Sequence, residues 1–390
     1  MSRTSKFIRL GAIAAAAVVT LGACGSSSSG GSDGEIAVKI GRLTPLTGDF
    51  VSAGKKPNEA FDMALEAGRE KYKGRLKIEL KDFDQGATPQ TAIAAYQKAK
   101  AWGADVTISI GGATPQGLAI AEAAKGTLQL GNFGTSLKEV NPTGFNQFAL
   151  MADYQYPIGI ELFYDQVGKD LKSAAYVSAD TYQVGEEAVK SWRDYLEGKG
   201  VKTTLTDQVS GTETNLTALA RKIVDSDASV VVADMPVPNT IALTTALKRA
   251  GFKGIGFGGA TQSSGTLLEN APHLFDGYYA MTAWSPLQKN LTPVAQKFVK
   301  DYTARYPKSG APDQYEAYSY DGLTQYLYAV DAAGTTDTDK VAEKLRGEGP
   351  EGVGLEKITF GKDQFFKMPV KLLRIEDNVA QVVASADDQS

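Results

Sequence analysis

The feature that most constrains the fold is a strand–loop–helix–strand–loop pattern between residues 106 and 136. Val106–Ile110 is a short apolar run followed by small residues, Pro115 opens a helix that ends at Gly126, and a second short run precedes Asn132. Two strands joined in this way are parallel, so their carboxyl ends lie side by side. Open parallel sheets bind ligands beyond these ends, where loop NH groups and a helix N-terminus can face a negative group. The pattern therefore predicts a binding site in these loops.

The two loops contain groups suited to ligand binding. Gly111 and Gly112 allow another molecule to approach the backbone closely, and Thr114, Thr135 and Ser136 offer hydroxyl groups. The alternative interpretation is that each loop is an ordinary turn between a strand and a helix.

The same unit recurs on both sides of this stretch. Apolar strands that are covered by helices on both sides form doubly wound, Rossmann-like sheets, and the second half of the chain repeats the pattern of the first. The sequence therefore predicts an α/β fold with two such lobes in series. We expect strands over 36–43, 76–83, 145–151, 173–179, 201–209, 229–234, 255–259 and 278–284, with helices that include 57–68 and 88–102.

The C-terminal part departs from this pattern. Two strongly periodic helices are expected over 294–306 and 318–333. Two strand-like runs, Leu355–Phe360 and Met368–Glu376, then flank a turn at 361–363, which predicts a hairpin. The pattern alone does not assign these elements to one lobe or the other.

The N-terminus is typical of an exported lipoprotein. Three basic residues precede the apolar segment Leu10–Thr20, which is too short to span a bilayer as a mature helix. Leu21–Cys24 resembles the bacterial lipobox, in which cleavage leaves a diacylated cysteine, and Cys24 is the only cysteine in the chain. We expect a signal peptide over 1–23, lipidation at Cys24 and a flexible Gly/Ser tether over 24–35. The alternatives are an incidental cysteine and a leader without a role.

Composition excludes several classes of function. A formal net charge of -4 and the absence of a dense basic run argue against nucleic acid as a partner. With His273 as the sole histidine and Cys24 lipidated, a catalytic triad or a zinc cluster cannot be assembled, so we expect no enzyme activity. Asp82 and Asp84 could bind a cation, but carboxylates before a helix more often cap it, and we expect no metal. The glycines at 256–259 match neither nucleotide-binding pattern, so no cofactor is expected.

The order of these parts resembles the periplasmic, type I solute-binding proteins of ABC importers, in the branch of the branched-chain amino acid (Leu/Ile/Val) binding proteins. The resemblance covers roughly Ile36–Val383. It rests on Ile40–Gly48 (IGRLTPLTG), Asp82–Gln85, Gly111–Gln116, Asn132–Thr135, Pro312–Asp321 (PDQYEAYSYD) and Ile358–Phe360 in the terminal hairpin.

The resemblance implies a periplasmic binding protein-like I fold with a ligand between two lobes. Three crossovers form the hinge, near 149–153, 283–285 and 347–352. Lobe 1 would comprise 36–150 and 285–348, and lobe 2 would comprise 151–284 and 349–390.

The resemblance also implies a binding site, with departures at several positions. Thr135 matches the threonine that holds the ligand α-carboxylate, and Gly112 or Ala113 stands where the family usually has serine. Ala53 and Val184 replace aromatic residues, and Ala260 replaces the acidic partner of the ligand ammonium group. An α-amino acid ligand then needs another carboxylate, from Asp234, Asp180 or Glu316; otherwise the ligand lacks an amine. The candidate ligand-binding residues are Gly112, Ala113, Thr114, Phe133, Thr135, Tyr182, Val184, Asp234, Ala260 and Tyr315.

The function that the resemblance implies is that of an extracytoplasmic solute-binding lipoprotein anchored to the cell membrane. It would capture an amino acid or another small carboxylated or polar solute and pass it to an ABC permease, acting as a monomer. The alternatives are a ligand-sensing receptor of the same fold, or a binder of aromatic acids or amides rather than amino acids. A secreted hydrolase would fit the anchor but not the near absence of histidine and cysteine.

Overall fold

The computed structural model describes residues 34–47, 51–111, 114–131, 139–147, 155–180, 183–360, 362, 364–366 and 368–386. At 52, 53, 114, 169, 183, 184, 263 and 266 it describes the backbone alone. The expected signal peptide, Cys24 and nearly all of the tether lie outside the described residues. Within them, no helix combines the length and the apolar character that a membrane span requires.

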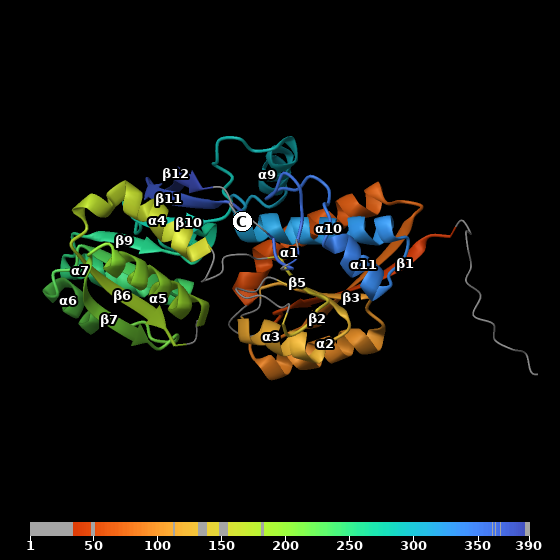
Figure 1. Ribbon diagram of the computed structural model, residues 1–390, viewed down its shortest axis with the longest axis horizontal. Coiled ribbons are helices and arrows are strands. Elements are labelled where there is room, and N and C mark those ends of the chain that lie inside the picture. The colour runs from red at the N-terminus through yellow and green to blue at the C-terminus, as the bar shows by residue number, and fades with distance from the viewer. Residues whose placement is uncertain are drawn as a thin grey trace, which may run out of the picture. The chain divides into compact units, whose positions relative to one another are not determined.

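The first sheet contains five parallel strands in the order β2-β1-β3-β4-β5. Its helices lie on both faces (Figure 1), with α2 and α3 on one side and α1 on the other. The strands are β1 (Ile36–Thr44), β2 (Leu76–Asp84), β3 (Val106–Ser109), β4 (Leu128–Gly131) and β5 (Gly144–Asn146), and the helices are α1 (Val51–Lys71), α2 (Pro89–Trp102) and α3 (Thr114–Ala123).

The second sheet contains seven strands in the order β12-β11-β10-β9-β8-β6-β7. Its five parallel strands, β7-β6-β8-β9-β10, repeat the strand order of the first sheet, and the antiparallel pair β11–β12 extends one edge. This repetition confirms the predicted fold of two doubly wound sheets. The strands are β6 (Ser173–Ala179), β7 (Lys202–Val209), β8 (Val230–Asp234), β9 (Ile255–Gly258), β10 (Tyr279–Thr282), β11 (Val370–Glu376) and β12 (Val379–Ala386).

Helices also cover both faces of the second sheet. On one face, Phe163 and Trp192 pack their rings against Phe257 of β9, with ring centroids 4.5 and 4.9 Å apart. On the other face, leucines such as Leu219 and Leu247 form a separate apolar cluster. The helices are α4 (Gln155–Val167) and α5 (Gln183–Gly198) on the first face, and α6 (Thr217–Asp225) and α7 (Val237–Ala250) on the second; η1 (Gly168–Asp170), η2 (Ala260–Ser263) and α8 (Gly265–Asn270) are short.

The helices that follow β10 return to the first sheet. Helix α9 (Pro293–Arg305) contacts α1 through Arg305, which forms an ion pair with Glu66 at 2.5 Å. Helix α10 (Gln314–Ala333) packs along α1, and α11 (Thr338–Leu345) packs against α10.

The structure corrects three expectations about element boundaries. Helix α1 begins at Val51 rather than at Pro57, because Lys56 and Asn58 bond Ala311 and Thr44 and hold its first turns in place. Strand β5 spans only 144–146 within the described residues, rather than 145–151.

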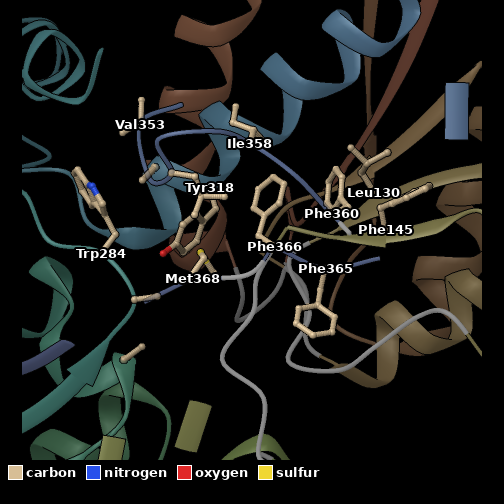
Figure 2. Packing of buried hydrophobic residues seen from close by; sticks show 14 of the residues in the cluster. Leu130, Phe145, Trp284, Tyr318, Val353, Ile358, Phe360, Phe365, Phe366 and Met368 are labelled. Atoms are coloured by element: carbon tan, nitrogen blue, oxygen red, sulfur yellow. The ribbon is translucent and has the colours of Figure 1, made fainter. Parts of the chain in front are cut away.

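The third correction concerns the terminal hairpin. Residues 355–360 are not a strand, since their apolar side chains fill an irregular part of the core (Figure 2). The ring of Phe360 packs against Phe145 at 5.0 Å and against Phe366 at 4.4 Å. The hairpin is instead formed by β11 and β12, and its turn contains Asp377 and Asn378.

Candidate functional site

Each sheet has one point at which the order of its strands reverses. In the first sheet this point lies between β1 and β3, and in the second it lies between β6 and β8. The carboxyl ends of strands that meet at such a point leave a crevice in which α/β proteins bind ligands. The candidate site is therefore built from the loops that follow these strands.

Most of the predicted site residues in the first sheet lie outside the described residues, namely Gly112, Ala113, Phe133 and Thr135. Thr114 is the first residue of α3, so the loop after β3 runs into the N-terminus of that helix. Gly111 in this loop has a φ of +72°, which favours glycine. The side-chain amide of Gln85 donates to the carbonyl oxygen of Ile110 at 2.9 Å and holds the end of β3 in place.

The acidic residues at the end of β2 are used within the fold. Asp82 forms an ion pair with Arg42 at 2.7 Å. Asp84 accepts hydrogen bonds from the NH groups of Leu46 and Gly86, both at 2.9 Å, and from the Thr47 hydroxyl at 2.5 Å. Although burial opposes it, the hydrogen bonds of Thr47 and the loop lower the pKa of Asp84. Asp84 thus joins the loops after β1 and β2, and the described residues contain no group of three or more acidic, histidine or cysteine side chains that could hold a metal.

Asp234 is the last residue of β8 and lies at the reversal point of the second sheet. The residue is 2% exposed, and its Oδ1 is enclosed and accepts no hydrogen bond from a described residue. With no donor or cation to offset it, burial raises the pKa of Asp234 to about 7.

The neighbours of Asp234 are small. Ser178 of β6 is its register partner and is also buried. Gly259, directly after β9, borders the carboxylate, since a Cβ at 259 would lie 2.4 Å from Oδ2 of Asp234. The next residue, Ala260, opens η2 and is buried. The carboxylate of Asp234 therefore lies beside the segment in which the family resemblance expects an acidic residue.

The other two candidate carboxylates already have partners. Asp180 is exposed and accepts the NH of Gly211 at 2.9 Å. Glu316 is buried but accepts the NH of Asp313 at 2.7 Å in the capping box of α10. Burial and the nearby Asp313 carboxylate raise the pKa of Glu316. Of the three, Asp234 alone has a buried carboxylate oxygen without a hydrogen-bond partner among the described residues.

Of the remaining sequence candidates, Tyr182 and Val184 have no described side chain, whereas Tyr315 and His273 do. Tyr182 lies outside the described residues, and Val184 belongs to the first turn of α5, where only the backbone is described. Tyr315 is half-buried in the first turn of α10 and packs against the core. The histidine, His273, is an exposed loop residue whose Nδ1 lies 3.0 Å from Asp276.

Sequence reasoning missed Ser178 and Gly259. A signal for Ser178 exists, because it follows Tyr176 by two residues and so lies on the same face of β6. Its pairing with Asp234 depends on strand order and register, which no local pattern contains. Gly259 was noted only as part of a glycine-rich run that fits no nucleotide-binding motif.

Comparisons with known proteins agree with this architecture. A family model described as periplasmic binding protein matches residues 37–380. No curated protein matches the sequence.

Solved structures with the same fold include proteins that bind different ligands. One is a leucine binding protein, LivK, from Thermotoga maritima MSB8, at 19% identity and a TM-score of 0.80 over 90% of this chain and 99% of that chain. Another is LivJ, a branched-chain amino acid transporter substrate binding protein from Streptococcus pneumoniae in complex with isoleucine, at 15% identity and a TM-score of 0.79 over 90% and 99%. A third is a solute binding protein of an ABC transporter from Rhodopseudomonas palustris BisB5 in complex with 3,4-dihydroxybenzoic acid, at 19% identity and a TM-score of 0.78 over 90% and 98%. At these identities the similarity shows the fold.

Proposed function

The chain belongs to the periplasmic binding protein family, and from this membership we propose that it is the solute-binding component of an ABC importer. It captures a small carboxylated or polar solute, such as an amino acid, between two lobes and delivers it to a membrane permease. No bond of the solute is broken. The observation that carries the proposal is the repetition of one strand order in two sheets, because each sheet then supplies one reversal point and one half of a site.

The lobes of the proposed protein follow the sheets. We assign 36–150 and 285–348 to the first lobe, and 151–284 and 349–390 to the second. The contacts of α9 and α10 with α1 support the return of 285–348 to the first lobe, and the pairing of β11 with β10 supports the second assignment. Because Phe360 packs against Phe145 of β5, the third crossover extends along the first sheet before it reaches β11.

The two lobes have different roles in the proposed site. The first lobe binds the ligand carboxylate through loop NH groups and hydroxyls at Gly112, Ala113, Thr114 and Thr135, with Phe133 nearby. The second lobe determines specificity through the loops at 180–184, 234–238 and 260–262. Tyr315 lies at the mouth of the site. A ligand that contacts both lobes binds the closed form more tightly than the open form, so it favours closure.

Two ligand classes have support among the similar structures. The Streptococcus protein binds isoleucine, whereas the Rhodopseudomonas protein binds 3,4-dihydroxybenzoic acid, which has no amine. The alternative to an amino acid is therefore an aromatic acid, and Ala260 favours it because no acidic side chain occupies that position.

A screen of the purified protein by thermal shift tests the proposal. Amino acids, aromatic and aliphatic acids, amides and polyols are compared, and specific binding raises the melting temperature through mass action. Replacement Thr135→Val should then weaken a carboxylate ligand by about 1–3 kcal/mol through a lost hydrogen bond, as measured by calorimetry. Thr206→Val, at an exposed position of β7, is the control and should leave affinity unchanged. Equal affinity in Thr135→Val would remove Thr135 from the site.

The family is extracytoplasmic, and the N-terminal sequence supports a lipid anchor at Cys24. Residues 24–35 serve as the tether between the anchor and a monomeric body. Replacement Cys24→Ser removes the acylated side chain and should move the protein from the membrane fraction to the soluble extracytoplasmic fraction, because the lipid supplies the membrane affinity. Fractionation followed by immunoblotting measures this shift, and an unchanged membrane fraction would contradict the anchor.

A further inference from the structure

Strand β12 forms one edge of the second sheet (Figure 1) and lacks the features that usually protect such an edge. Of the edge strands of the two sheets, β2 and β7 carry charged side chains, and β5 is only 3 residues long. In contrast, β12 has 8 residues, VAQVVASA, with no charged residue and no proline. Proteins usually block free edges with charges, prolines or very short strands, because a free edge can pair with another chain. The edge of β12 is therefore a candidate docking site.

The main chain of β12 has hydrogen-bonding groups along this edge. Residues 377–378 have positive φ angles and form the two-residue turn of the β11–β12 hairpin. In such a hairpin the residues that flank the turn bond each other across the strands, and bonded and non-bonded pairs then alternate. Val379 and Gln381 therefore bond β11, whereas the NH and carbonyl groups of Ala380 and Val382 point away from it. Among the described strands β12 pairs with β11 alone, so these groups are open to a further strand.

A groove of about 690 Å³ accompanies the edge. It is lined by β12 and by residues 287–290 of the loop that follows β10. Leu287, Val379 and Val383 line it with side chains that are 53%, 41% and 40% exposed. They are three of only five large hydrophobic residues that are exposed in the described part of the chain. Such a concentration of exposed apolar side chains beside a free strand edge indicates a surface that another molecule covers.

The charged residues that line the groove are both lysines. Lys289 is exposed on the loop, whereas Lys371 of β11 is buried and donates to the carbonyl oxygen of Ala283 at 3.1 Å. None of the described residues that line the groove is acidic. An occupant with an acidic side chain is therefore attracted to the groove, and a basic occupant is repelled.

A bulge in β12 limits the length of the strand that can be added. Leu373 pairs with Val382 and Leu372 pairs with Ala384, so Val383 has no opposite residue on β11. A bulge bends its strand and interrupts the regular pattern of hydrogen bonds. Bulges at sheet edges also prevent two long edges from pairing with each other. The regular stretch 379–382 thus suits a short peptide segment better than a second copy of β12.

We propose that this groove binds an extended, acidic segment of another protein, which adds to β12 as a short strand. The main chain of Ala380 and Val382 bonds the segment, its apolar side chains cover Leu287 and Val379, and an acidic side chain pairs with Lys289. Strand addition takes its affinity from main-chain hydrogen bonds and its specificity from the alternating side chains. None of the described residues that line the groove belongs to the candidate solute site, so the inference is independent of the solute.

Calorimetric titration of the purified protein with synthetic peptides tests the inference. The first peptide is Glu-Val-Thr-Val-Glu-Val-Thr-Val-Glu with blocked ends, the second has lysine in place of glutamate, and the third is the first with every amide N-methylated. The acidic peptide should bind at a single site with millimolar affinity or better, and the lysine peptide should bind at least about 3-fold more weakly. The N-methylated peptide should not bind, because it cannot donate hydrogen bonds to β12. Hydrogen exchange measured by mass spectrometry should show slower exchange over 379–386 when the acidic peptide is bound.

A pair of charge-reversal variants tests the role of the exposed lysine. Lys289→Glu should weaken the acidic peptide by about 3- to 10-fold and strengthen the lysine peptide, because it reverses the charge beside the edge. The control is Lys202→Glu, at an exposed position of β7 on the opposite edge of the same sheet, and it should change neither affinity.

Several results would overturn the inference without affecting the proposed function. These are no binding of the acidic peptide, equal binding of the N-methylated peptide, slower exchange outside 379–386 alone, or unchanged affinities in Lys289→Glu. Analytical ultracentrifugation of the protein without peptide examines the other occupant. A dimer in which the amides of 379–386 are protected would show that a second copy fills the groove, and the inference would then be wrong.

Discussion

A buried carboxylate without a partner makes the stability of the unliganded protein depend on pH. The pKa of Asp234 is about 7 in the folded protein, above the ordinary 3.8 that it regains on unfolding. The folded state therefore holds its proton more tightly than the unfolded state between these values. The contribution of Asp234 to stability is greatest below pH 3.8 and is lost as the pH rises through 7.

This fall in stability with rising pH leads to a prediction for Asp234→Asn. The variant cannot ionise, so it should gain stability relative to the unmodified protein as the pH rises from 5 to 8, by on the order of 2–4 kcal/mol. Urea unfolding of both proteins at the two pH values, without ligand, measures the difference. A difference that is the same at pH 5 and pH 8 would show that Asp234 does not ionise in this range.

At the scale of single residues, the sequence named Asp234 but did not distinguish it from Asp180 and Glu316. All three are acidic residues near the ends of expected elements. What separates them is the partner of each carboxylate: the NH of Gly211 for Asp180, and the NH of Asp313 for Glu316. The first pair is 31 residues apart in the chain, so its formation depends on tertiary structure and not on local pattern.

At the scale of elements, local signals were sufficient where they are strong. Thr88, Pro89 and Gly103 predicted the limits of one helix, and α2 runs from Pro89 to Trp102 with Thr88 as its N-cap and Gly103 in the left-handed conformation. Local sequence signals failed for residues 355–360, where apolar residues predicted a strand. Those side chains are buried by an irregular segment that packs on β5 and α10, and tertiary packing, not strand pairing, explains the apolar pattern.

The glycine-rich segment 347–354, which precedes the irregular residues 355–360, gives a second prediction. The NH groups of Val353 and Gly354 donate to Asp321 of α10 at 2.6 and 2.7 Å. A Cβ at Gly352 would lie 2.6 Å from both Oδ2 of Asp321 and Cγ1 of Ile358. Gly352→Ala should therefore lower the free energy of unfolding by about 1–3 kcal/mol, because it overpacks this contact.

Gly347→Ala is the matched control on the same segment. A Cβ at 347 has its nearest neighbour, the carbonyl oxygen of Lys344, at 3.4 Å, so the change should stay within about 0.5 kcal/mol of the unmodified protein. Urea unfolding measures both variants. Equal stability of the two would show that Gly352 is not closely packed against Asp321.

At the scale of the whole molecule, the repetition of βα units predicted two sheets, and both were found. The order of strands within each sheet could not be predicted from periodicity, because a parallel unit can add to either side of the preceding strand. The reversal points between β1 and β3 and between β6 and β8 therefore became visible only in the structure. The pairing of Ser178 with Asp234 could not be predicted for the same reason, because it depends on the order of the strands.

The last prediction concerns closure of the two proposed lobes. A ligand that binds both lobes stabilises the closed form, because it gains contacts there that the open form cannot offer. The radius of gyration from small-angle X-ray scattering should fall when the compound that raises the melting temperature most in the thermal-shift screen is added at saturation, and a compound that leaves the melting temperature unchanged should produce a much smaller change at the same concentration. If calorimetry shows saturation while the radius of gyration stays constant, the ligand binds without closure, and capture between two moving lobes is the wrong mechanism.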